Sequence, residues 1–490
     1  MGPIIVFLLC AAVVSAAPPP KHLPLESRLR ALIDSTPGAR TAHWGILAVD
    51  LKTGKPIFAH NEKRLFIPAS NTKLYTTALA FERLGPGHRF HTKIVADLPA
   101  DSAGRIEGDL RLVGGGDPTL SARAYPYTKA PSSNPPYAAL EELADQLIAR
   151  GVKSIQGDIV GDDTYYPHDP FADGWAVDDP AYEYGSPVSA LILNDNAFRL
   201  TVEAGNLTGE PTQISLFPNI EYFVIQNNVL SVPGRDRKVN LHRSPSSNEV
   251  ILDGSIGVDA RPFVELLGVD DPALFAASAL REILERRGVR VDGTARAHHR
   301  ALGSGKLAGG QILAERMSLP LTETAKVVNK VSQNLHAEIL LREVALHRRG
   351  EGTRKLGHEE MTLFLAQAGA AKEGFNFEDG SGLSRLTLVT PETSVKLLQY
   401  MNRSKNAKAF SATLPIGGED GTLDKRFAGL VGGKRVHAKT GSLSHVSALS
   451  GYIDSVTRGR IAFSIMVNNF NVPTSEVRSV IDKIAVALAE

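Results

Sequence analysis

Cysteine is almost absent from this chain, and so is any bias toward charge of one sign. The one cysteine is Cys10, so the chain can form no internal disulfide, and its cysteine usage is neutral about its compartment. Lysine and arginine number 54 and aspartate and glutamate number 53, which leaves a net charge of +1. No run of basic residues is available to neutralise a phosphate backbone, so a nucleic acid is not expected as a partner.

Long apolar runs are also missing, except for one segment at the N-terminus. No later stretch approaches the ~20 apolar residues of a membrane-spanning helix. Residues 4–14 are apolar and are followed by the small residues Ser15, Ala16 and Ala17. This pattern predicts a signal peptide over residues 1–16, and therefore a soluble periplasmic product without a transmembrane anchor. The alternative is a buried N-terminal strand, since no lysine or arginine precedes the apolar run.

The 490 residues are enough for two or three domains with sizeable cores. Apolar periodicity predicts helices and strands near both ends of the chain. Helices are expected over residues 70–84, 138–151, 321–331, 335–348 and 475–489, and strands over 44–49, 56–59, 435–439, 446–453 and 460–468. Between residues 90 and 305, short β-like runs alternate with Gly/Asp turns. We therefore expect an α/β (α+β) domain, built from both ends of the chain and interrupted by a large β-rich insert.

Changes in composition suggest where these domains begin and end. The domain built from both ends is expected to comprise residues 22–89 and 306–490. The insert then occupies residues 90–118 and 190–305. A loop rich in Pro, Ser and Tyr, followed by the predicted helix over 138–151, indicates a second insert nested inside the first, over residues 119–189.

The first chemically suggestive motif is Ser70-Asn71-Thr72-Lys73, at the start of a predicted helix. Ser70 and Lys73 are three residues apart, so they share one face of the helix. A serine hydroxyl is a weak nucleophile until a base takes its proton, and lysine is such a base only when burial or a nearby cation lowers its pKa. The backbone N–H of Ser70 at the helix start can help to stabilise an oxyanion. Alone, the pair would be an ordinary surface feature.

The second motif, Ser332-Gln333-Asn334, lies between two predicted helices, where a cap or a turn is the ordinary explanation. A functional interpretation requires Ser332 to relay a proton to a leaving amine. It also requires Asn334 to bind an amide of the substrate. Neither role can be assigned from this tripeptide alone, because similar Ser-x-Asn sequences recur along the chain.

The third motif, Lys439-Thr440-Gly441, ends a predicted strand. Lys439 and Thr440 can hold a carboxylate, and Gly441 can let a substrate backbone approach closely. Lys439 would also supply a second cation beside Lys73. Another Lys-Thr-Gly, at residues 52–54, precedes the serine and lies in the turn of a predicted hairpin, so it is out of order.

Three motifs in this order are typical of active-site-serine enzymes. With them in place, the chain resembles the class C low-molecular-mass penicillin-binding proteins, the D-alanyl-D-alanine carboxypeptidase/endopeptidases. Residues 112–118, 186–191 and 379–385 are similar to further family segments. The resemblance runs from roughly residue 30 to the end of the chain, and the long insert between the first two motifs is its most specific feature. It implies a penicillin-binding/β-lactamase-like transpeptidase fold, with an antiparallel sheet flanked by helices.

The resemblance also implies a reaction on peptidoglycan stem peptides. Ser70 would be acylated by the penultimate D-alanine carbonyl, D-alanine would leave, and water would release the acyl-enzyme. The implied roles are Lys73 as base, Ser332 as proton relay, Asn334 on the substrate amide, Lys439 with Thr440 on the terminal carboxylate, and the N–H groups of Ser70 and Ser442 as oxyanion hole. β-Lactams would inhibit because their acyl-enzyme hydrolyses slowly. No cofactor or metal is required, and the histidines show no ligand spacing.

A pocket for the free end of the stem-peptide side chain is a further implication of the resemblance. Its expected residues are Arg385, Leu443, Ser444, Asp179 and Tyr184. Arg385 and Ser444 would contact a carboxylate, with Leu443 at the wall. Asp179, followed by Tyr184, would meet an amine, and the adjacent Asp178 is an alternative for that role.

Two other functions share parts of this pattern. A β-lactamase has the three motifs but deacylates rapidly, and class A enzymes place the first two motifs far closer together. A catalytically silent binding protein on the same fold would usually have lost at least one motif residue, whereas all are present. Carboxypeptidase and endopeptidase activity proceed through the same acyl-enzyme, so the sequence leaves both open.

Overall fold

The computed structural model describes residues 23–490, except 35, 131, 133, 245–246 and 305–308. The signal peptide expected over residues 1–16 lies outside the described residues, as does Cys10. Along the described part of the chain, no helix combines the length and the apolar character needed to cross a bilayer.

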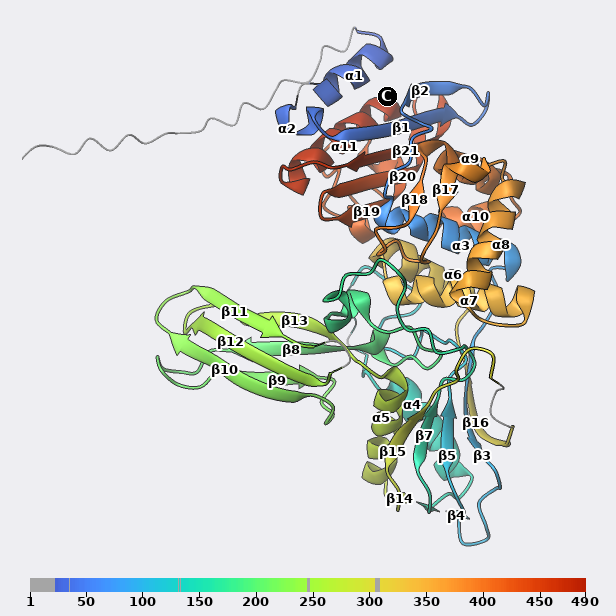
Figure 1. Ribbon diagram of the computed structural model, residues 1–490, viewed down its shortest axis with the longest axis vertical. Coiled ribbons are helices and arrows are strands. Elements are labelled where there is room, and N and C mark those ends of the chain that lie inside the picture. The colour runs from blue at the N-terminus through green and yellow to red at the C-terminus, as the bar shows by residue number, and fades with distance from the viewer. Residues whose placement is uncertain (1–22, 35, 131, 133, 245–246, 305–308) are drawn as a thin grey trace, which may run out of the picture.

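Both ends of the chain meet in one five-stranded sheet, at the top of Figure 1. Every neighbouring pair in this sheet is antiparallel. The strand order is β19 (Val436–Leu443), β20 (Val446–Ser455), β21 (Gly459–Asn468), β1 (His43–Asp50) and β2 (Pro56–His60). The predicted hairpin forms as β1 and β2, and the three C-terminal strands form where the sequence predicts them. The expectation of an antiparallel sheet made from both ends is confirmed.

Helices cover both faces of this sheet, because successive residues of a strand point to opposite faces. In β1, Ile46 and Ala48 pack in the core under α1 (Leu25–Asp34) and α11 (Thr474–Ala489). Leu47 and Val49 pack in the opposite core. The helices on that side are α3 (Thr72–Arg83), α7 (Asn334–Arg349), α8 (Arg354–Gln367), α9 (Pro391–Arg403) and, at the edge, α6 (Leu321–Lys326) and α10 (Ala407–Ser411). Strands with two covered faces are buried along most of their length, as β1 and β20 are.

A second five-stranded sheet forms the lower part of Figure 1. Its order is β15 (Ala295–His298), β7 (Ile159–Asp162), β5 (Leu110–Val113), β3 (His91–Ala96) and β16 (Gln311–Met317). Helices α4 (Ala138–Ala149) and α5 (Pro272–Arg286) pack on it in one core. Three short strands, β4 (Arg105–Ile106), β6 (Ser154–Ile155) and β14 (Arg290–Val291), form a small sheet beside it.

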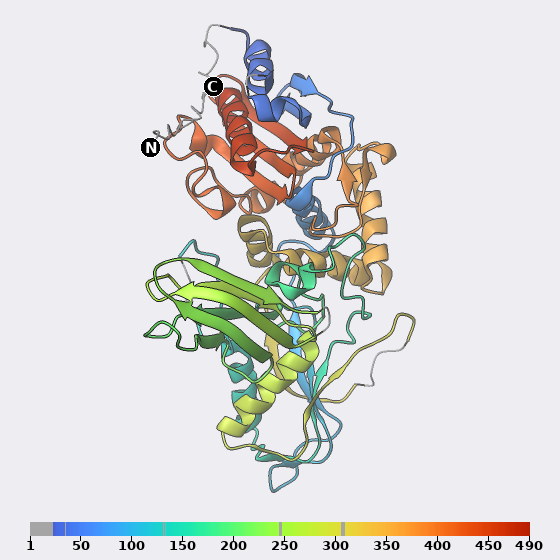
Figure 2. The same cartoon turned by 60° about the vertical axis from the view of Figure 1, so that its left-hand side comes forward.

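The third part projects to the side and holds residues 197–268 (Figures 1 and 2). It contains two three-stranded sheets with a small core between them. The first sheet has β8 (Ala197–Glu203), β9 (Gln213–Phe217) and β13 (Phe263–Gly268), and the second has β10 (Val224–Val232), β11 (Arg237–His242) and β12 (Glu249–Gly257).

The strand pairing differs from the expected domain division at two points. Strand β16 pairs with β3, so the chain returns to the first domain after residue 317 rather than at residue 306. Helix α4 and strand β7 share a core and a sheet with β5, so residues 119–189 are not a separate nested unit. The nested unit is residues 197–268 instead. The Pro-rich sequence of residues 125–136 suggested a boundary between β5 and α4. The apolar face of α4 nevertheless packs on the sheet that contains β5.

Candidate active site

Ser70 lies in a tight turn that the sheet holds in place. The turn is the 3-10 helix η1 (Ala69–Asn71), and α3 begins two residues after Ser70 rather than at it. Ala69 has a left-handed backbone, with φ of 48°. The buried Asn71 side chain donates from Nδ2 to Ser450 Oγ at 2.9 Å, which anchors the turn to β20. A left-handed alanine beside the candidate nucleophile is strained backbone of the kind that collects at functional sites.

Two glycines from separate segments press on this turn. A Cβ at Gly382, where φ is +80°, would collide with the carbonyl oxygen of Ala69. A Cβ at Gly441 would collide with the carbonyl oxygen of Pro68. The sequence suggested that Gly441 leaves room for a substrate backbone. In the structure, the backbone that approaches Gly441 closely is the protein's own turn at Ser70. Only glycine fits at either position.

Lys73 is fully buried, and its ammonium nitrogen has three oxygen neighbours. Nζ lies 2.9 Å from Ser70 Oγ, 2.5 Å from Asn334 Oδ1 and 2.7 Å from the Ser381 carbonyl oxygen. An amide oxygen and a carbonyl oxygen can only accept, whereas a serine hydroxyl can accept or donate. When Lys73 is neutral, its two N–H groups satisfy Asn334 and Ser381, and the remaining lone pair faces the Ser70 hydroxyl.

Burial lowers the pKa of Lys73 to about 7, because the charged form loses its hydration inside the protein. The carboxylates of Asp379, Glu338 and Glu183 act in the opposite direction and favour the charged form. Desolvation outweighs them. A large fraction of Lys73 is therefore neutral near pH 7, which is the state that a general base requires.

A second buried lysine faces the second motif. Lys439 Nζ donates to Ser332 Oγ at 2.8 Å and to the Thr440 carbonyl at 2.8 Å. Ser332 follows a π-helical turn (Val327–Val331) and has a left-handed backbone, with φ of 72°. The pKa of Lys439 lies well below its usual value, first because of burial and second because of the nearby Lys73 charge. The Lys73 ammonium is thus close enough to act electrostatically on Lys439.

Two buried carboxylates shape the loop that supplies the Ser381 carbonyl. Glu338 Oε1 accepts hydrogen bonds from the N–H groups of Gly380 and Ser381, both at 2.8 Å. Asp379 accepts from the N–H groups of Gly382 at 2.9 Å and Ser384 at 2.8 Å. The loop therefore wraps around fixed negative charge. Sequence reasoning noticed residues 379–385 as a segment but missed Glu338, whose only sequence signal is its place four residues after Asn334.

The insert holds the second motif from the other side. Gln333 Nε2 donates to Glu183 Oε1 at 2.9 Å, and Asn334 Nδ2 donates to the Tyr184 carbonyl at 2.7 Å. Both acceptors lie in the 3-10 helix η3 (Glu183–Gly185). Asn334 therefore bridges Lys73 on one side and the insert on the other. Sequence reasoning did not predict that Gln333 and Glu183 would pair.

Arg385, Ser444 and Asp179, three of the residues expected in the side-chain pocket, lie near one another. Arg385 is exposed and donates to the Ser444 carbonyl, at 3.3 Å from Nη1 and 3.2 Å from Nη2. Asp179 is 8% exposed, accepts from the Ala176 N–H at 2.8 Å and is held by the 3-10 helix η2 (Asp179–Ala181). Burial raises the pKa of Asp179, and Arg385 partly offsets this. Asp178, by contrast, is an exposed residue.

The remaining predicted residues follow the edge strand β19. Thr440 Oγ1 donates to Thr422 Oγ1 at 2.8 Å, which fixes the direction of its hydroxyl. The exposed Ser442 accepts at Oγ from Arg478 at 2.8 Å, and Leu443 is half-buried. Tyr184 is 42% exposed and stacks on Tyr182, with ring centroids 5.6 Å apart. Strand β19 is the first strand of its sheet, and residues 415–417 pair with its outer edge at residues 436–438. Beyond Ala438 no further strand of the described residues pairs with this edge.

Comparisons with known proteins agree on one family. The D-Ala-D-Ala carboxypeptidase 3 (S13) family matches residues 25–490. Over 469 residues the chain is 34% identical to a D-alanyl-D-alanine carboxypeptidase of Actinomadura sp. (strain R39), covering 93% of this chain and 82% of that protein. It is 27% identical over 437 residues to D-alanyl-D-alanine carboxypeptidase DacB of Haemophilus influenzae, covering 87% and 85%. The crystal structure of penicillin binding protein 4 (dacB) from Haemophilus influenzae shares the fold, with a TM-score of 0.80 at 24% identity over 94% of this chain and 99% of that one.

The close contact between Gly382 and the turn at Ser70 can be tested by substitution. Gly382→Ala should lower the free energy of unfolding by roughly 2–4 kcal/mol, because it adds a collision to the cost of a left-handed alanine. Gly54→Ala is the matched control, since Gly54 also has positive φ, +71°, but a Cβ there would meet no described atom within 4 Å. The control should lose only about 1 kcal/mol. Urea unfolding measures both, and equal losses would contradict the close contact at Gly382.

Proposed function

The chain belongs to the D-Ala-D-Ala carboxypeptidase 3 (S13) family, and we propose that it hydrolyses peptidoglycan stem peptides through an acyl-enzyme on Ser70. One observation carries this proposal. A buried lysine with a pKa of about 7 lies 2.9 Å from the Ser70 hydroxyl, and its other two neighbours can only accept hydrogen bonds. That arrangement leaves the lone pair of Lys73 for the proton of Ser70.

Acylation begins when Ser70 Oγ attacks the carbonyl carbon between the two D-alanines and its proton passes to Lys73 Nζ. The N–H groups of Ser70 and Ser442 are proposed to donate to the oxyanion that forms. In support, the Ser70 turn and the β19 strand are held against each other at Gly441, so the two donors come from elements in direct contact. Preorganised donors of this kind require no rearrangement during the reaction.

The leaving amine then needs a proton. Ser332 is proposed to give its proton to the amine nitrogen as the C–N bond breaks, and to be reprotonated from Lys439, 2.8 Å away. D-Alanine leaves, and the carbonyl stays bound to Ser70 as an ester. Lys73 would then pass the proton that it took from Ser70 to the neutral Lys439, so that both lysines regain their starting states. A water molecule would attack the ester next, and its proton would move through Lys73 Nζ to the departing Ser70 Oγ, which releases the shortened peptide and restores the Ser70 hydroxyl.

Substrate recognition is proposed to involve both ends of the reacting peptide. Lys439 and Thr440 would hold the terminal carboxylate, and the Thr440 hydroxyl would turn its proton from Thr422 to the carboxylate when the substrate binds. Asn334 would contact the substrate amide, in addition to its bonds to Lys73 and Tyr184. The peptide would lie along the outer edge of β19 beyond Ala438, where main-chain hydrogen bonds would add it to the sheet.

The rim formed by Arg385, Ser444 and Asp179 is proposed to select the free end of the stem-peptide side chain. Arg385 is exposed and can bind a carboxylate, while its contact to the Ser444 carbonyl fixes its direction. Asp179 is favoured over Asp178 for the amine, because Asp179 is nearly buried and interacts electrostatically with Arg385. The exposed ring of Tyr184 and the half-buried Leu443 would form the wall.

The cellular setting and inhibitor follow from the same proposal. Peptidoglycan lies outside the cytoplasmic membrane, so the proposed substrate agrees with export by the apolar N-terminal segment into the periplasm. Both carboxypeptidase and DD-endopeptidase reactions fit the site, because both begin with the same acyl-enzyme. β-Lactams are proposed as covalent inhibitors, and penicillin binding protein 4 of Haemophilus influenzae has been crystallised in complex with one.

Mass spectrometry after brief exposure to benzylpenicillin tests the acyl-enzyme. We expect one adduct per chain, located on Ser70, which persists because water reaches the ester slowly. Ser70→Ala should show no adduct, since the nucleophile is gone. Hydrolysed drug with an unmodified protein would indicate a β-lactamase instead. Neither adduct nor hydrolysis would contradict the catalytic assignment and favour a silent binding protein.

The pKa of Lys73 predicts how the rate of acylation depends on pH. Lys73 acts as a base only when neutral, so below its pKa of about 7 the rate should fall about tenfold per pH unit. Above that pKa the rate should level off. Stopped-flow acylation by a chromogenic β-lactam from about pH 5 to about pH 9 measures this profile. A rate that still rises steeply at the upper end would mean that Lys73 keeps an ordinary lysine pKa.

The amine contact can be tested with two D-Ala-D-Ala peptides that differ only in acetylation of the side-chain amine. The wild type should prefer the free amine, and Asp179→Asn should lose about tenfold of that preference, because it removes one charge from the rim. Asp178→Asn is the matched control and should keep the preference. If the control loses the preference and Asp179→Asn keeps it, then Asp178 has the role. Acylation by benzylpenicillin should stay unchanged in both variants.

A further inference from the structure

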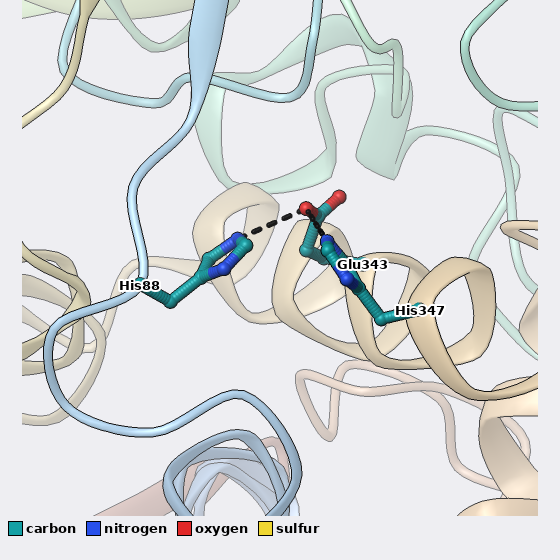
Figure 3. A group of neighbouring side chains, drawn as sticks. All are labelled: His88, Glu343 and His347. Carbon is teal, nitrogen blue, oxygen red and sulfur yellow. Dashed lines mark hydrogen bonds and ion pairs between the residues drawn. The ribbon is translucent and has the colours of Figure 1, made fainter.

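Away from the serine site, one carboxylate brings two histidines together (Figure 3). His88 Nε2 and His347 Nε2 each lie 3.0 Å from Glu343 Oε1. The three atoms that could bind a metal all lie within 4.8 Å of one another. The two imidazole rings are nearly perpendicular, with centroids 4.9 Å apart. Each ring therefore directs its Nε2 toward the same atom, Glu343 Oε1.

The fold supplies these residues from distant parts of the chain. Glu343 and His347 are one turn apart on α7, so they share a face of that helix. His88 lies between α3 and β3, where the chain first leaves the catalytic domain for the insert. The Tyr166 hydroxyl, from the insert, donates to Glu343 Oε2 at 2.5 Å. This bond orients the carboxylate so that Oε1 faces the rings, as outer hydrogen bonds commonly do for metal ligands.

We propose that His88, Glu343 and His347 bind a Zn²⁺ ion. Two imidazole nitrogens and one carboxylate oxygen are a ligand set that zinc uses, with bonds of about 2.0–2.2 Å. In a tetrahedral site such ligand atoms lie roughly 3.3 Å from each other. The two nitrogen-to-oxygen distances of 3.0 Å are close to this value, and the two nitrogens lie within 4.8 Å of each other, so rotation of the rings toward each other would admit the ion.

The surroundings leave room for a fourth ligand and a path of entry. A cavity of about 520 Å³ is lined by all three residues together with Gly114, Gly115 and Tyr165. The Glu343 side chain is 2% exposed, whereas that of His347 is 45% exposed. Zinc would therefore enter past His347 and be held against the buried carboxylate, with water completing its coordination from the cavity side.

A second group of acidic and histidine residues is not expected to bind a metal ion. In the cluster of Asp163, His168 and His299, the His299 ring already has a carboxylate at each nitrogen. Nδ1 lies 3.0 Å from Asp163 Oδ1, and Nε2 lies 3.4 Å from Asp271 Oδ2. Two carboxylate partners hold the ring as a doubly donating imidazolium, which has no lone pair for a metal. That cluster is explained as an ion pair.

The proposed ion would join three segments at one junction. His88 comes from the crossing between domains, Tyr166 from the insert, and Glu343 from the helix whose first residue is Asn334. Zinc would therefore stabilise the junction of the catalytic domain with the insert. It takes no part in acyl transfer, because its ligands on α7 lie toward the end of that helix opposite to Asn334. The proposal is thus independent of the proposed reaction.

The test uses the full chain, without a polyhistidine tag and stripped of metal by a chelator. Isothermal titration with Zn²⁺ should show one bound equivalent, and zinc should raise the unfolding temperature measured by circular dichroism. His347→Ala and His88→Ala should each weaken zinc binding at least about tenfold. His242→Ala is the matched control, since His242 also pairs with a carboxylate, Asp253, at 2.8 Å but belongs to no three-ligand group among the described residues. The control should bind zinc like the wild type.

Failure to bind zinc, or equal binding by the wild type and both variants, would overturn the proposal. If the variants do not fold, Co²⁺ bound to the wild type replaces them as the readout. Four-coordinate Co²⁺ with imidazole ligands absorbs strongly in the visible range, and the absence of this absorption would also overturn the site. Because none of these measurements involves acylation, their failure leaves the serine mechanism untouched.

Discussion

The removal of Lys73 from water is the interaction on which the rest of the site depends. A charged lysine inside a protein has lost its hydration, and the pKa of this group falls to about 7 as a result. Three carboxylates nearby limit the fall without reversing it. The balance keeps the lysine close to half-charged at neutral pH. A fully exposed lysine would stay protonated at neutral pH. A lysine paired directly with a carboxylate would hold its proton more strongly still.

The surrounding structure excludes water from this lysine and keeps it in contact with Ser70. Gly382 and Gly441 allow two separate segments to approach the turn at Ser70 closely, and Asn71 hydrogen-bonds that turn to the sheet. Glu338 holds the loop that presents the Ser381 carbonyl. The insert closes the remaining side, through the Tyr184 carbonyl on Asn334. The insert therefore contacts the site through the 3-10 helix η3.

Local patterns were enough to predict the strands of the sheet built from both ends of the chain, but not how distant segments pair. The strands β1, β2, β19, β20 and β21 are indicated by apolar runs and turn residues, and the three motifs by their order. The strand pairing differs from the expected domain boundaries at β16 and α4, because composition marks loops whereas membership of a sheet depends on pairing between separate segments. Strand β16 pairs with β3 across more than 200 residues. Strand β16 follows a loop whose composition is typical of a domain linker, and nothing in its own sequence indicates β3 as its partner.

The same reason explains which site residues were missed. Ser70 and Lys73 are close in sequence, so helix geometry predicts their contact. The pairing of Gln333 with Glu183 joins residues 150 apart, and the His88–Glu343 contact joins residues 255 apart. Such contacts follow from the tertiary fold alone. The left-handed conformations of Ala69 and Ser332 were equally hidden, because neither residue type favours them.

A direct titration of Lys73 tests the central claim most sharply. The side-chain carbon signals of isotopically labelled lysine report each amine's protonation by NMR, and comparison with Lys73→Arg identifies the signal. The account predicts a midpoint of about 7 for Lys73, with the exposed lysines titrating near their usual value. A midpoint for Lys73 close to that of the exposed lysines would contradict it, since Ser70 would then have no neutral base beside it.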